Sequence, residues 1–359
     1  MTEVRPEKSE NRPAGDDVTE VAPGVLRVML PVAMPGLGHV NCYVLTDERG
    51  ITLIDPGLAD GVTHDVLTQR LADVDLDIRR VHTAVVTHSH HDHFGGVNRL
   101  LSLDTIQPVA VVAHTSFGRS WSAAYDDLVA EDSASWSVRD GDDPLIETAA
   151  RFIRPTRWGT MTDPVPIDYL RELADGIGLV GALRPPRLTI AVEDGERIRL
   201  GGVDWLALHT PGHADDHLCL FDETHGTLLG GDHLLPTITP HISGLSDYDD
   251  PLQTFFDSLH RIHGLTDVKI ALPAHGDPFE NVHDRVSAIR EHHDGRLDKL
   301  VEIHDAQGPG HTEHFMKHLF RERSWGSMAA SETYAHLEWL RLHGSATRTE
   351  VDGRPFYDF

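Results

Sequence analysis

Cysteine is almost absent from this chain, which has only 2 among its 359 residues. That number excludes both a disulfide framework and a metal site built from four thiolates. Long apolar runs are missing too: no stretch of about 18 apolar residues occurs, so no membrane span is expected. The opening segment, MTEVRPEKSENRPAGDD, also lacks the apolar run of a secretory signal. We therefore expect a cytoplasmic protein without a membrane partner.

Positive charge is the second shortage. The chain has 31 Lys and Arg residues against 57 Asp and Glu residues, a formal charge of −26. Nucleic acids and anionic membranes repel such a charge, so a protein that coats either one is disfavoured. The length allows a substantial core, in one large domain or two smaller ones. Histidine is the residue in surplus, with 26 copies.

Strand-like runs alternate with helical patterns through much of the chain, which predicts an α/β layered fold. A helix is expected over 60–72, with Val62, Val66, Leu67 and Leu71 on its buried face. Strands are expected at 25–32, 41–47, 51–55, 81–87, 108–114, 203–210, 217–221, 227–232 and 268–275, with a helix near 251–263.

The remaining segments suggest how the chain is divided. Residues 1–17 are polar and predict a disordered tail. Residues 18–280 form the main domain, which helical patterns and three of the six tryptophans interrupt at about 115–188. Residues 188–200 have the pattern of a β-hairpin that turns at an Asp-Gly pair. The last part, 281–359, is helical and ends in a helix followed by a hairpin, which predicts a small winged-helix-like domain.

The histidines become informative directly after the apolar strand at 81–87. There the chain reads His88-Ser89-His90-His91-Asp92-His93. His88 and His90 are two apart in extended backbone and project to the same side, while Asp92 and His93 can face a neighbouring point where a helix begins. One short segment can therefore supply ligands to two adjacent metal ions; the alternative is a polar surface loop. Imidazole and carboxylate suit zinc best, with iron or manganese possible.

Three later segments each place a candidate ligand at the end of an apolar strand, where the active sites of layered α/β folds collect. They are His213 in HTPGHADDH, Asp232 in LLGGDH and His275 in LPAHG. With the first cluster they give five histidines and two aspartates, a number that fits two metals with several ligands each. Because one carboxylate can bridge two ions, Asp232 is the better candidate for a shared ligand.

The motifs THSHHDHFGG, TPGHADDH, GGDH and PAHG, in this order, resemble those of the metallo-β-lactamase-fold hydrolase superfamily. The resemblance covers about residues 20–280, and the residues after the later motifs resemble a branch with a winged-helix-like C-terminal domain. That branch includes acyl-thioester hydrolases and an RNA-cleaving member. The fold implied is an αββα sandwich with a two-metal centre at one edge of the sheets. The insertion at 115–188 departs from the plainer members of the family.

The resemblance also implies roles for individual residues. It implies two metal sites that share one aspartate, with His88, His90 and His213 at the first, Asp92, His93 and His275 at the second, and Asp232 between them. Asp55, in LIDPG, would orient a ligand histidine through a hydrogen bond, or would be only a turn residue. Asp92 would also orient the nucleophile or relay a proton to the leaving group.

Two zinc ions lower the pKa of a shared water, so hydroxide would be available to attack an acyl carbonyl. No cysteine nucleophile is needed, and Cys42 and Cys219 lie in apolar strand patterns typical of the core. We hypothesise that the insertion at 115–188 covers this centre and forms an apolar pocket, the alternative being a peripheral or dimer surface. His233 and His241 follow the shared aspartate and are candidates for contacts with substrate.

These features predict a dinuclear metal hydrolase that cleaves a thioester, ester or lactone in a small metabolite. A phosphodiesterase or endoribonuclease, a nucleic-acid-binding regulator, and a mononuclear iron dioxygenase of sulfur compounds are the alternatives. Residues 283–359 have 10 Lys and Arg against 13 Asp and Glu, which disfavours nucleic acid as a partner. We expect the C-terminal domain to support the main domain or to mediate a homodimer.

Overall fold

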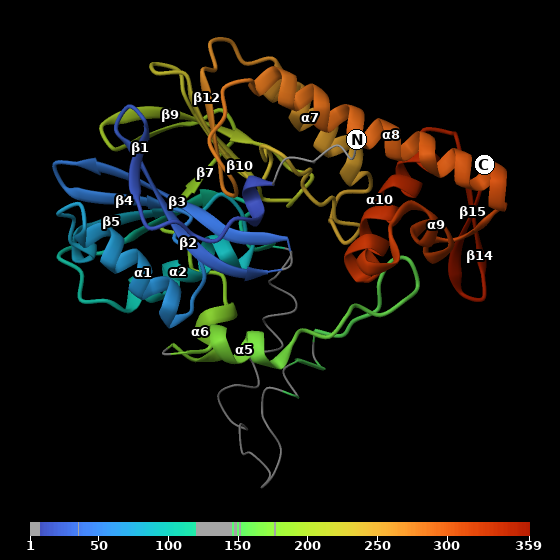
Figure 1. Ribbon diagram of the computed structural model, residues 1–359, viewed down its shortest axis with the longest axis horizontal. Helices are drawn as coiled ribbons and strands as arrows, with labels where there is room; N and C mark the ends of the chain where they lie inside the picture. The colour runs from blue at the N-terminus through green and yellow to red at the C-terminus, as the bar shows by residue number, and fades with distance from the viewer. Residues whose placement is uncertain (1–7, 35, 120–145, 147–148, 151, 176) are drawn as a thin grey trace, which may run out of the picture.

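The computed structural model describes residues 8–359 except 35, 120–145, 147–148, 151 and 176. Two β-sheets pack face to face, and helices cover the outer face of each (Figure 1). One hydrophobic cluster fills the space between the sheets, and two larger clusters lie between each sheet and its helices. The predicted αββα sandwich is therefore confirmed. Among the described helices, none combines the length and the apolar character needed to cross a membrane.

The first sheet contains seven strands in sequence order, antiparallel at one end and parallel at the other. Its strands are β1 (Val18–Ala22), β2 (Val25–Met34), β3 (Leu37–Asp47), β4 (Gly50–Ile54), β5 (Val81–Val85), β6 (Ala110–His114) and β7 (Ile190–Val192). Two helices, α1 (Gly61–Ala72) and α2 (His91–Ser102), connect β4 to β5 and β5 to β6 and pack on its outer face. This arrangement places the end of β5, and the histidine motif that follows it, at the edge of the sheet.

The second sheet contains five strands in the order β12-β11-β10-β9-β8. Its strands are β8 (Arg197–Leu200), β9 (Val203–His209), β10 (Leu218–Asp222), β11 (Thr227–Gly231) and β12 (Ile270–Pro273). Helix α7 (Pro251–His263) joins β11 to β12, and the long α8 (Val282–Gln307) follows β12. The three segments that carry the later candidate ligands all follow strands of this sheet.

Two local predictions were wrong. The Asp194-Gly195 turn does not form a hairpin, because β7 pairs with β6 in the first sheet whereas β8 pairs with β9 in the second. A turn signal shows that the chain changes direction, but it does not specify the strand with which the next segment pairs. On α1, Val62 is 66% exposed, and Thr63 is buried beside Leu67 instead.

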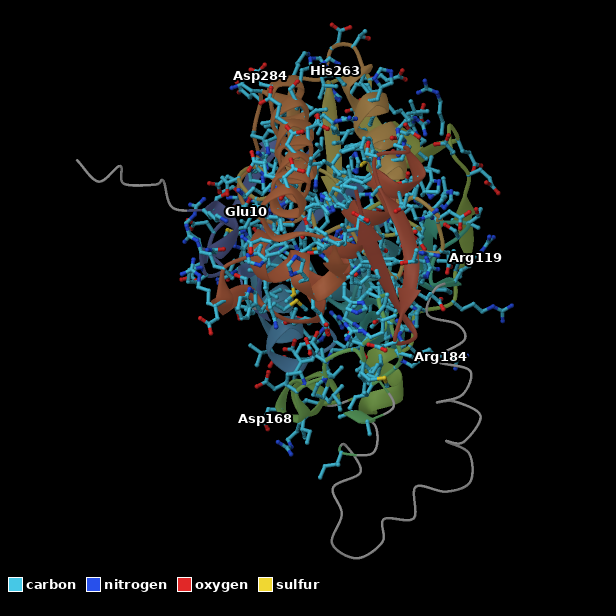
Figure 2. The ribbon with its side chains drawn as sticks, turned by 90° about the vertical axis from the view of Figure 1, so that its right-hand side faces the viewer. Glu10, Arg119, Asp168, Arg184, His263 and Asp284 are labelled. Atoms are coloured by element: carbon cyan, nitrogen blue, oxygen red, sulfur yellow. The ribbon has the colours of Figure 1, made fainter. Side chains whose placement is uncertain are left out.

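The expectation of a disordered N-terminal tail does not hold for residues 8–17, and residues 1–7 lie outside the described residues. Ser9–Asn11 form a short 3₁₀ helix, and the side chain of Glu10 is fully buried. Its carboxylate accepts hydrogen bonds from the backbone N–H of Thr237 at 2.7 Å and of Ile238 at 3.0 Å. Glu10 therefore fixes this segment to the body of the protein near α8 (Figure 2).

The C-terminal region continues the second layer of helices. After α8 come β13 (Gly310–His311), α9 (Thr312–Leu319), α10 (Ser327–Leu342) and the hairpin of β14 (Thr347–Val351) and β15 (Arg354–Asp358). The expected helix and hairpin are thus present, and the hairpin turns through Asp352 and Gly353, which both have positive φ. Helices α8 to α10 share one hydrophobic cluster with α7 and the second sheet, so this region packs directly on the main domain. Its winged-helix character and the boundary at 281 remain predictions.

Only part of the insertion at 115–188 is described. Helices α5 (Ile167–Leu173) and α6 (Gly178–Leu183) pack against the first sheet's cluster and lie below α1 and α2 in Figure 1. In Figure 2, Asp168 and Arg184 mark this end of the molecule, opposite His263 and Asp284. The helical pattern predicted at 122–129, together with Trp121 and Trp136, lies outside the described residues.

Candidate metal centre

The histidine motif folds as a turn between strand β5 and helix α2. His88 and His90 precede the helix, and Asp92 and His93 lie in its first turn. The two glycines that follow let α2 approach the loop after β4, because a Cβ on Gly96 would lie 2.3 Å from a backbone oxygen of that loop. This loop carries Asp55, which is therefore held beside the motif.

Four side chains form a first group of converging ligand atoms: His88, His90, His213 and Asp232. The His90 Nδ1 atom lies 2.9 Å from His88 Nε2 and 3.2 Å from His213 Nε2. His213 Nε2 also lies 3.5 Å from Asp232 Oδ2. Ligands at the Zn–N distance in a tetrahedral site would be separated by about 3.3 Å, so these separations fit one bound cation.

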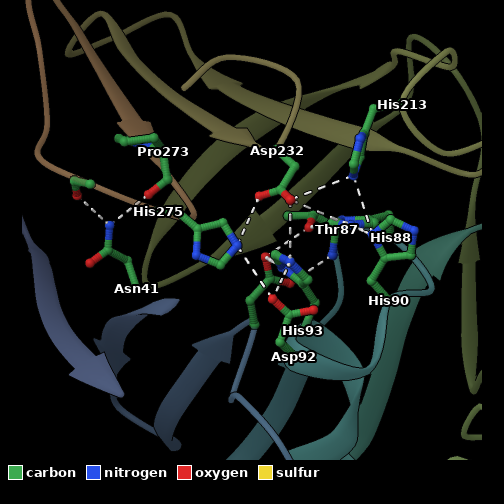
Figure 3. A network of polar contacts seen from close by, with 12 residues as sticks. Asn41, Thr87, His88, His90, Asp92, His93, His213, Asp232, Pro273 and His275 are labelled. Atoms are coloured by element: carbon green, nitrogen blue, oxygen red, sulfur yellow. Dashed lines mark hydrogen bonds and ion pairs between the residues drawn. The ribbon is translucent and has the colours of Figure 1, made fainter. Parts of the chain in front are cut away.

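A second group lies beside the first and consists of Asp92, His93 and His275. His275 Nε2 is 3.3 Å from Asp92 Oδ2 and 3.4 Å from Asp232 Oδ1. The other oxygen of Asp232 lies 3.7 Å from His93 Nε2 and also faces the first group. Asp232 therefore stands between the two groups, as Figure 3 shows, in the place expected for a shared ligand.

The ligand histidines are oriented through their other ring nitrogens. His93 Nδ1 lies 2.9 Å from the carboxylate of Asp55, and His88 Nδ1 lies 3.0 Å from the hydroxyl of Thr87. Two more such contacts go to backbone carbonyls, from His213 Nδ1 to His241 at 2.8 Å and from His275 Nδ1 to His39 at 2.6 Å. Such partners fix the tautomer that leaves the inner nitrogen free to bind a metal.

Asp55 links two of these contacts. Its carboxylate accepts hydrogen bonds from the Thr87 backbone N–H at 2.8 Å and from the Thr87 hydroxyl at 2.7 Å. Because that hydroxyl donates its proton to Asp55, it accepts from His88 Nδ1. Asp55 thus supports one histidine in each group, and it is more than a turn residue.

The ligand nitrogen and oxygen atoms that converge at the centre cannot all form hydrogen bonds with one another. Their unmet hydrogen-bonding capacity indicates whether the site suits a metal ion. His88 Nε2 and His213 Nε2 both present lone pairs to His90 Nδ1, which can donate only one hydrogen. His93 Nε2 and His275 Nε2 of the second group, and Oδ1 of the Asp232 carboxylate that faces them, are buried and have no hydrogen-bond partner. Unpaired buried polar atoms are strongly unfavourable, and cations placed among them would satisfy them. The donor set therefore fits bound divalent metal.

The pKa shifts of the histidines show how charge is distributed between the two groups. Burial lowers the pKa of His90 to about 3, and the neighbouring His213 adds to this effect. Burial opposes protonation of His93 as well, but the carboxylates of Asp92 and Asp232 raise its pKa to about 10. The second group therefore has an excess of negative charge, which attracts a cation.

His217 is a supporting residue that the sequence analysis did not identify. It is fully buried, and its Nε2 accepts from the backbone N–H of Asp232 at 3.0 Å while its Nδ1 contacts the Thr210 hydroxyl at 2.8 Å. A Cβ on Gly231, which has φ +50°, would lie 2.5 Å from that Nε2, so this position requires glycine. The available signal was the second histidine of HADDH, four residues after His213.

Three other buried polar residues hold the motif loops and were also missed. Asp216 accepts from the backbone N–H of Ser89 at 3.3 Å. His39 Nε2 accepts from the backbone N–H of Gly276 at 3.1 Å, and Asn41 donates to the carbonyl of the same glycine at 2.8 Å. The sequence signal for His39 and Asn41 was a polar residue in an apolar strand, whereas Asp216 lies within the HADDH segment of a recognised motif.

The two histidines proposed to contact substrate are placed elsewhere. His233 is fully buried against Phe255, with ring centroids 4.9 Å apart. His241 faces α10, where its Nδ1 lies 3.6 Å from Glu332. Neither residue is among those that line the pocket beside the first ligand group, so their contact with substrate stays a prediction. Closeness to Asp232 in sequence does not determine the side to which a loop residue points. The backbone carbonyl of His241 is the group that contacts His213 Nδ1 at the metal centre.

The loop that carries His241 is fixed to α10. The Ser331 hydroxyl accepts from the backbone N–H of Gly244 at 2.8 Å. A Cβ on Gly244 would lie 2.7 Å from the Ser331 carbonyl and 3.2 Å from the ring of Trp158, so only glycine fits between them. The C-terminal region thereby helps to position the carbonyl that orients His213.

A pocket of about 440 Å³ opens onto the first group. Ser89, His90 and His213 line its inner side, and two segments form its walls: Arg154, Pro155 and Arg157 from the insertion, and Ala214, Asp215, Ser243, Leu245, Ser246 and Asp247 from the second sheet's loops. Part of the insertion therefore lines the pocket beside the first group, and its covering of the metal centre stays a prediction. Two of its three lining residues are arginines, so this part of the pocket does not have the expected apolar lining.

Comparisons with known proteins agree with this geometry. Residues 35–275 match the model of the metallo-beta-lactamase superfamily. A probable metallo-hydrolase of Bacillus subtilis (strain 168) is 28% identical over 262 residues, which are 72% of this chain and 72% of that protein. An atrochrysone carboxyl ACP thioesterase of Aspergillus chevalieri is 25% identical over 284 residues, 78% of this chain and 65% of the relative.

Two solved structures resemble nearly the whole chain. A metallo-beta-lactamase family protein from Thermus thermophilus has a TM-score of 0.73 and 26% identity, covering 95% of this chain and 100% of that one. A beta-lactamase domain protein from Burkholderia ambifaria has a TM-score of 0.72 and 26% identity, covering 98% and 97%. Because the likeness spans this much of the chain, it includes the C-terminal region.

Proposed function

Because this chain belongs to the metallo-β-lactamase superfamily, we propose that it is a dinuclear zinc hydrolase that cleaves the acyl bond of a thioester. The observation that carries the proposal is the convergence of two ligand groups on one shared aspartate, next to an open pocket. His88, His90 and His213 would hold one ion, Asp92, His93 and His275 the other, and Asp232 both.

Bound in these groups, two zinc ions would supply Lewis acidity and lower the pKa of a shared water. The protein's own residues would do the rest. Asp92, whose Oδ2 faces both His93 and His275 at 3.5 and 3.3 Å, would orient the nucleophile and carry a proton toward the leaving thiol. Asp55 would keep His93 in position throughout. Cys42 and Cys219 are fully buried, so neither can act as a nucleophile on substrate in the pocket.

The thioester class is supported by the relatives and by the pocket. One relative, matched over 284 residues, is named an atrochrysone carboxyl ACP thioesterase, and further relatives carry that name over shorter matched segments. The pocket of about 440 Å³ is large enough for a metabolite-sized acyl group beside the first ligand group. For these two reasons we propose thioesters, rather than esters or lactones, as the first substrate class to test.

The decisive experiment combines metal analysis with an activity panel on the zinc-loaded protein. We expect two equivalents of zinc per chain and hydrolysis of acyl-CoA or other thioesters in preference to lactones, β-lactams, phosphodiesters and RNA. His275→Ala should abolish activity, whereas His318→Ala, on an exposed position of α9, should leave it unchanged.

Other outcomes would replace the proposal. Full activity of His275→Ala with well under two equivalents of metal would refute the two-metal site. Cleavage of RNA or phosphodiesters alone would establish a nuclease, and oxygen consumption with one bound iron and a sulfur substrate would establish a dioxygenase.

A further inference from the structure

The pocket next to the metal centre contains positive charge in a strongly acidic protein. Two of its lining residues, Arg154 and Arg157, come from the insertion, and the loop at 243–247 contributes further lining residues. The inner side is formed by Ser89, His90 and His213. A substrate whose reacting bond lies at the first ligand group would therefore share this pocket with both arginines.

The segment that carries the two arginines is a turn closed by backbone hydrogen bonds. The Arg154 carbonyl accepts from the Thr162 N–H at 2.9 Å, and the Thr156 N–H donates to the Thr160 carbonyl at 2.8 Å. Pro155 and Met161 also pair as an isolated antiparallel bridge. These bonds close the chain on itself and place Arg154 and Arg157 at the start of the turn.

Two contacts with α10 hold this turn in place. Trp158 is 1% exposed and packs on Tyr334, with ring centroids 5.7 Å apart. Asp163 and Ser327 exchange two hydrogen bonds of 2.8 Å, each backbone N–H donating to the other side chain. The arginines are thus anchored on both sides, so their place beside the pocket does not depend on a free loop.

Neither guanidinium is neutralised within the part of the chain that the structure describes. Other surface arginines have acidic partners, such as Arg199 with Asp204 at 3.0 Å, but no described carboxylate lies within ion-pair distance of Arg154 or Arg157. Of the pocket's own carboxylates, Asp215 already accepts a hydrogen bond from the Asp247 N–H at 2.7 Å. In a chain of net charge −26, such uncompensated arginines beside a reaction centre are suited to an anion.

We propose that Arg154 and Arg157 form an anion-binding subsite that holds a negatively charged group of the substrate while its acyl bond lies at His90 and His213. The subsite rests on the proposed thioester hydrolysis and deepens it. Guanidinium groups bind phosphate and carboxylate in the same bidentate manner. The anion can therefore be a phosphate on the thiol side, as in coenzyme A, or a carboxylate on the acyl side.

The kinetic test uses three thioesters that share one scissile bond type. Acetyl-CoA carries phosphates, the succinyl thioester of N-acetylcysteamine carries an acyl carboxylate, and the acetyl thioester of N-acetylcysteamine is neutral. For the Arg154→Ala/Arg157→Ala double variant we expect KM to rise at least tenfold on the charged substrate that the subsite binds. We expect kcat within twofold and unchanged kinetics on the neutral thioester. The arm that responds identifies the anion.

Two controls separate charge from structure. The double lysine variant should recover part of the affinity, because it keeps the charge but loses bidentate geometry. Arg199→Ala, which removes a paired arginine on β8, should behave as wild type. Equal changes on charged and neutral thioesters, or no change on any of them, would overturn the proposal.

A binding measurement keeps this inference separable from the proposed function. Desulfo-coenzyme A or succinate, added to the zinc-loaded protein in equilibrium dialysis, should bind at least tenfold more weakly to the double alanine variant. If wild type hydrolyses no thioester yet binds one of these anions through the two arginines, the thioesterase proposal fails and the subsite stands. If thioesters are hydrolysed and anion binding is the same in both proteins, the subsite is refuted.

Discussion

Two buried clusters of histidine and carboxylate in this protein look alike at first. One is the candidate metal centre, and the other consists of His293, Glu332 and His336 on α8 and α10. In the C-terminal cluster, and within each of the two groups of the candidate metal centre, the inward atoms lie within 4.8 Å of one another, and burial is nearly complete. By proximity alone, both would be metal sites.

The difference lies in how each cluster satisfies its own charges and hydrogen bonds. His336 Nδ1 donates to the Glu332 carbonyl at 2.7 Å, so its Nε2 accepts the hydrogen bond from His293 Nδ1 at 3.0 Å. The Glu332 carboxylate is paired with the guanidinium of Arg296 and also faces His241. A cation already occupies the place that a metal would need, and it would repel a second one.

The comparison teaches that surplus negative charge and unsatisfied atoms distinguish a metal site from a structural network. In the metal centre Asp92 and Asp232 face no lysine or arginine among the described residues, and three inner atoms lack hydrogen-bond partners. In the C-terminal cluster one atom, His293 Nε2, is without a partner. We therefore expect two bound metal ions per chain rather than three.

The largest effect is expected from removing the shared carboxylate. Asp232→Ala should lower kcat/KM by roughly 1,000-fold or more, because both ligand groups lose a member and the site loses a negative charge that attracts the two ions. Metal content measured by mass spectrometry should fall below two equivalents. Glu332→Gln is the matched control in the other cluster and should keep both ions. Equal metal loss in the two variants would mean that the clusters do not differ in this way.

The next effect concerns Arg296, whose guanidinium pairs with Glu332 in the C-terminal cluster. Arg296→Ala leaves the Glu332 carboxylate buried without its partner, which should lower the free energy of unfolding by about 3 kcal/mol. Lys299→Ala, which breaks an exposed pair on the same helix, should change it by at most about 0.5 kcal/mol. Chemical denaturation measures both. If Arg296 is what excludes metal, excess zinc should also restore part of the lost stability in Arg296→Ala alone.

A smaller effect is expected from replacing Asp55, which orients His93 directly and His88 through Thr87. Asp55→Asn keeps the shape of the side chain but removes the charge beside His93, so metal affinity should fall about 10- to 100-fold. Competition with a chelator provides the measurement, and Asp65→Asn on the exposed face of α1 is the control. An unchanged affinity would show that Asp55 supports only the loop.

The smallest effect is a dependence of stability on pH. Burial lowers the pKa of His336 to about 4 in the folded protein, against an ordinary value near 6.5. The unfolded chain therefore binds a proton that the folded one does not, and stability is lost as pH falls from about 6.5 toward about 4. His336→Gln should flatten this part of the curve of unfolding free energy against pH. The same slope in variant and wild type would mean that His336 is protonated in the folded state.

The sequence predicted the ligand positions because each lies where an apolar strand ends, and strand ends gather at one edge of a layered sheet. It could not predict residues whose contacts are distant in the chain. Glu10 had no periodicity or motif around it, and its partners are the backbone N–H groups of Thr237 and Ile238. The sequence around Arg154 and Arg157 did not indicate a site either. Their position beside the pocket depends on a turn that packs against α10, a helix far along the chain.

The close contacts at Gly244 limit how domains of this protein could be exchanged with those of a relative. At Gly244 the loop that supports His213, the Trp158 turn and helix α10 meet with no space for a methyl group. A C-terminal region grafted onto another catalytic domain would therefore meet surfaces shaped for different neighbours. We therefore expect a working chimera to require the joint transfer of residues 152–163, 241–246 and α10, which contact one another closely at this point.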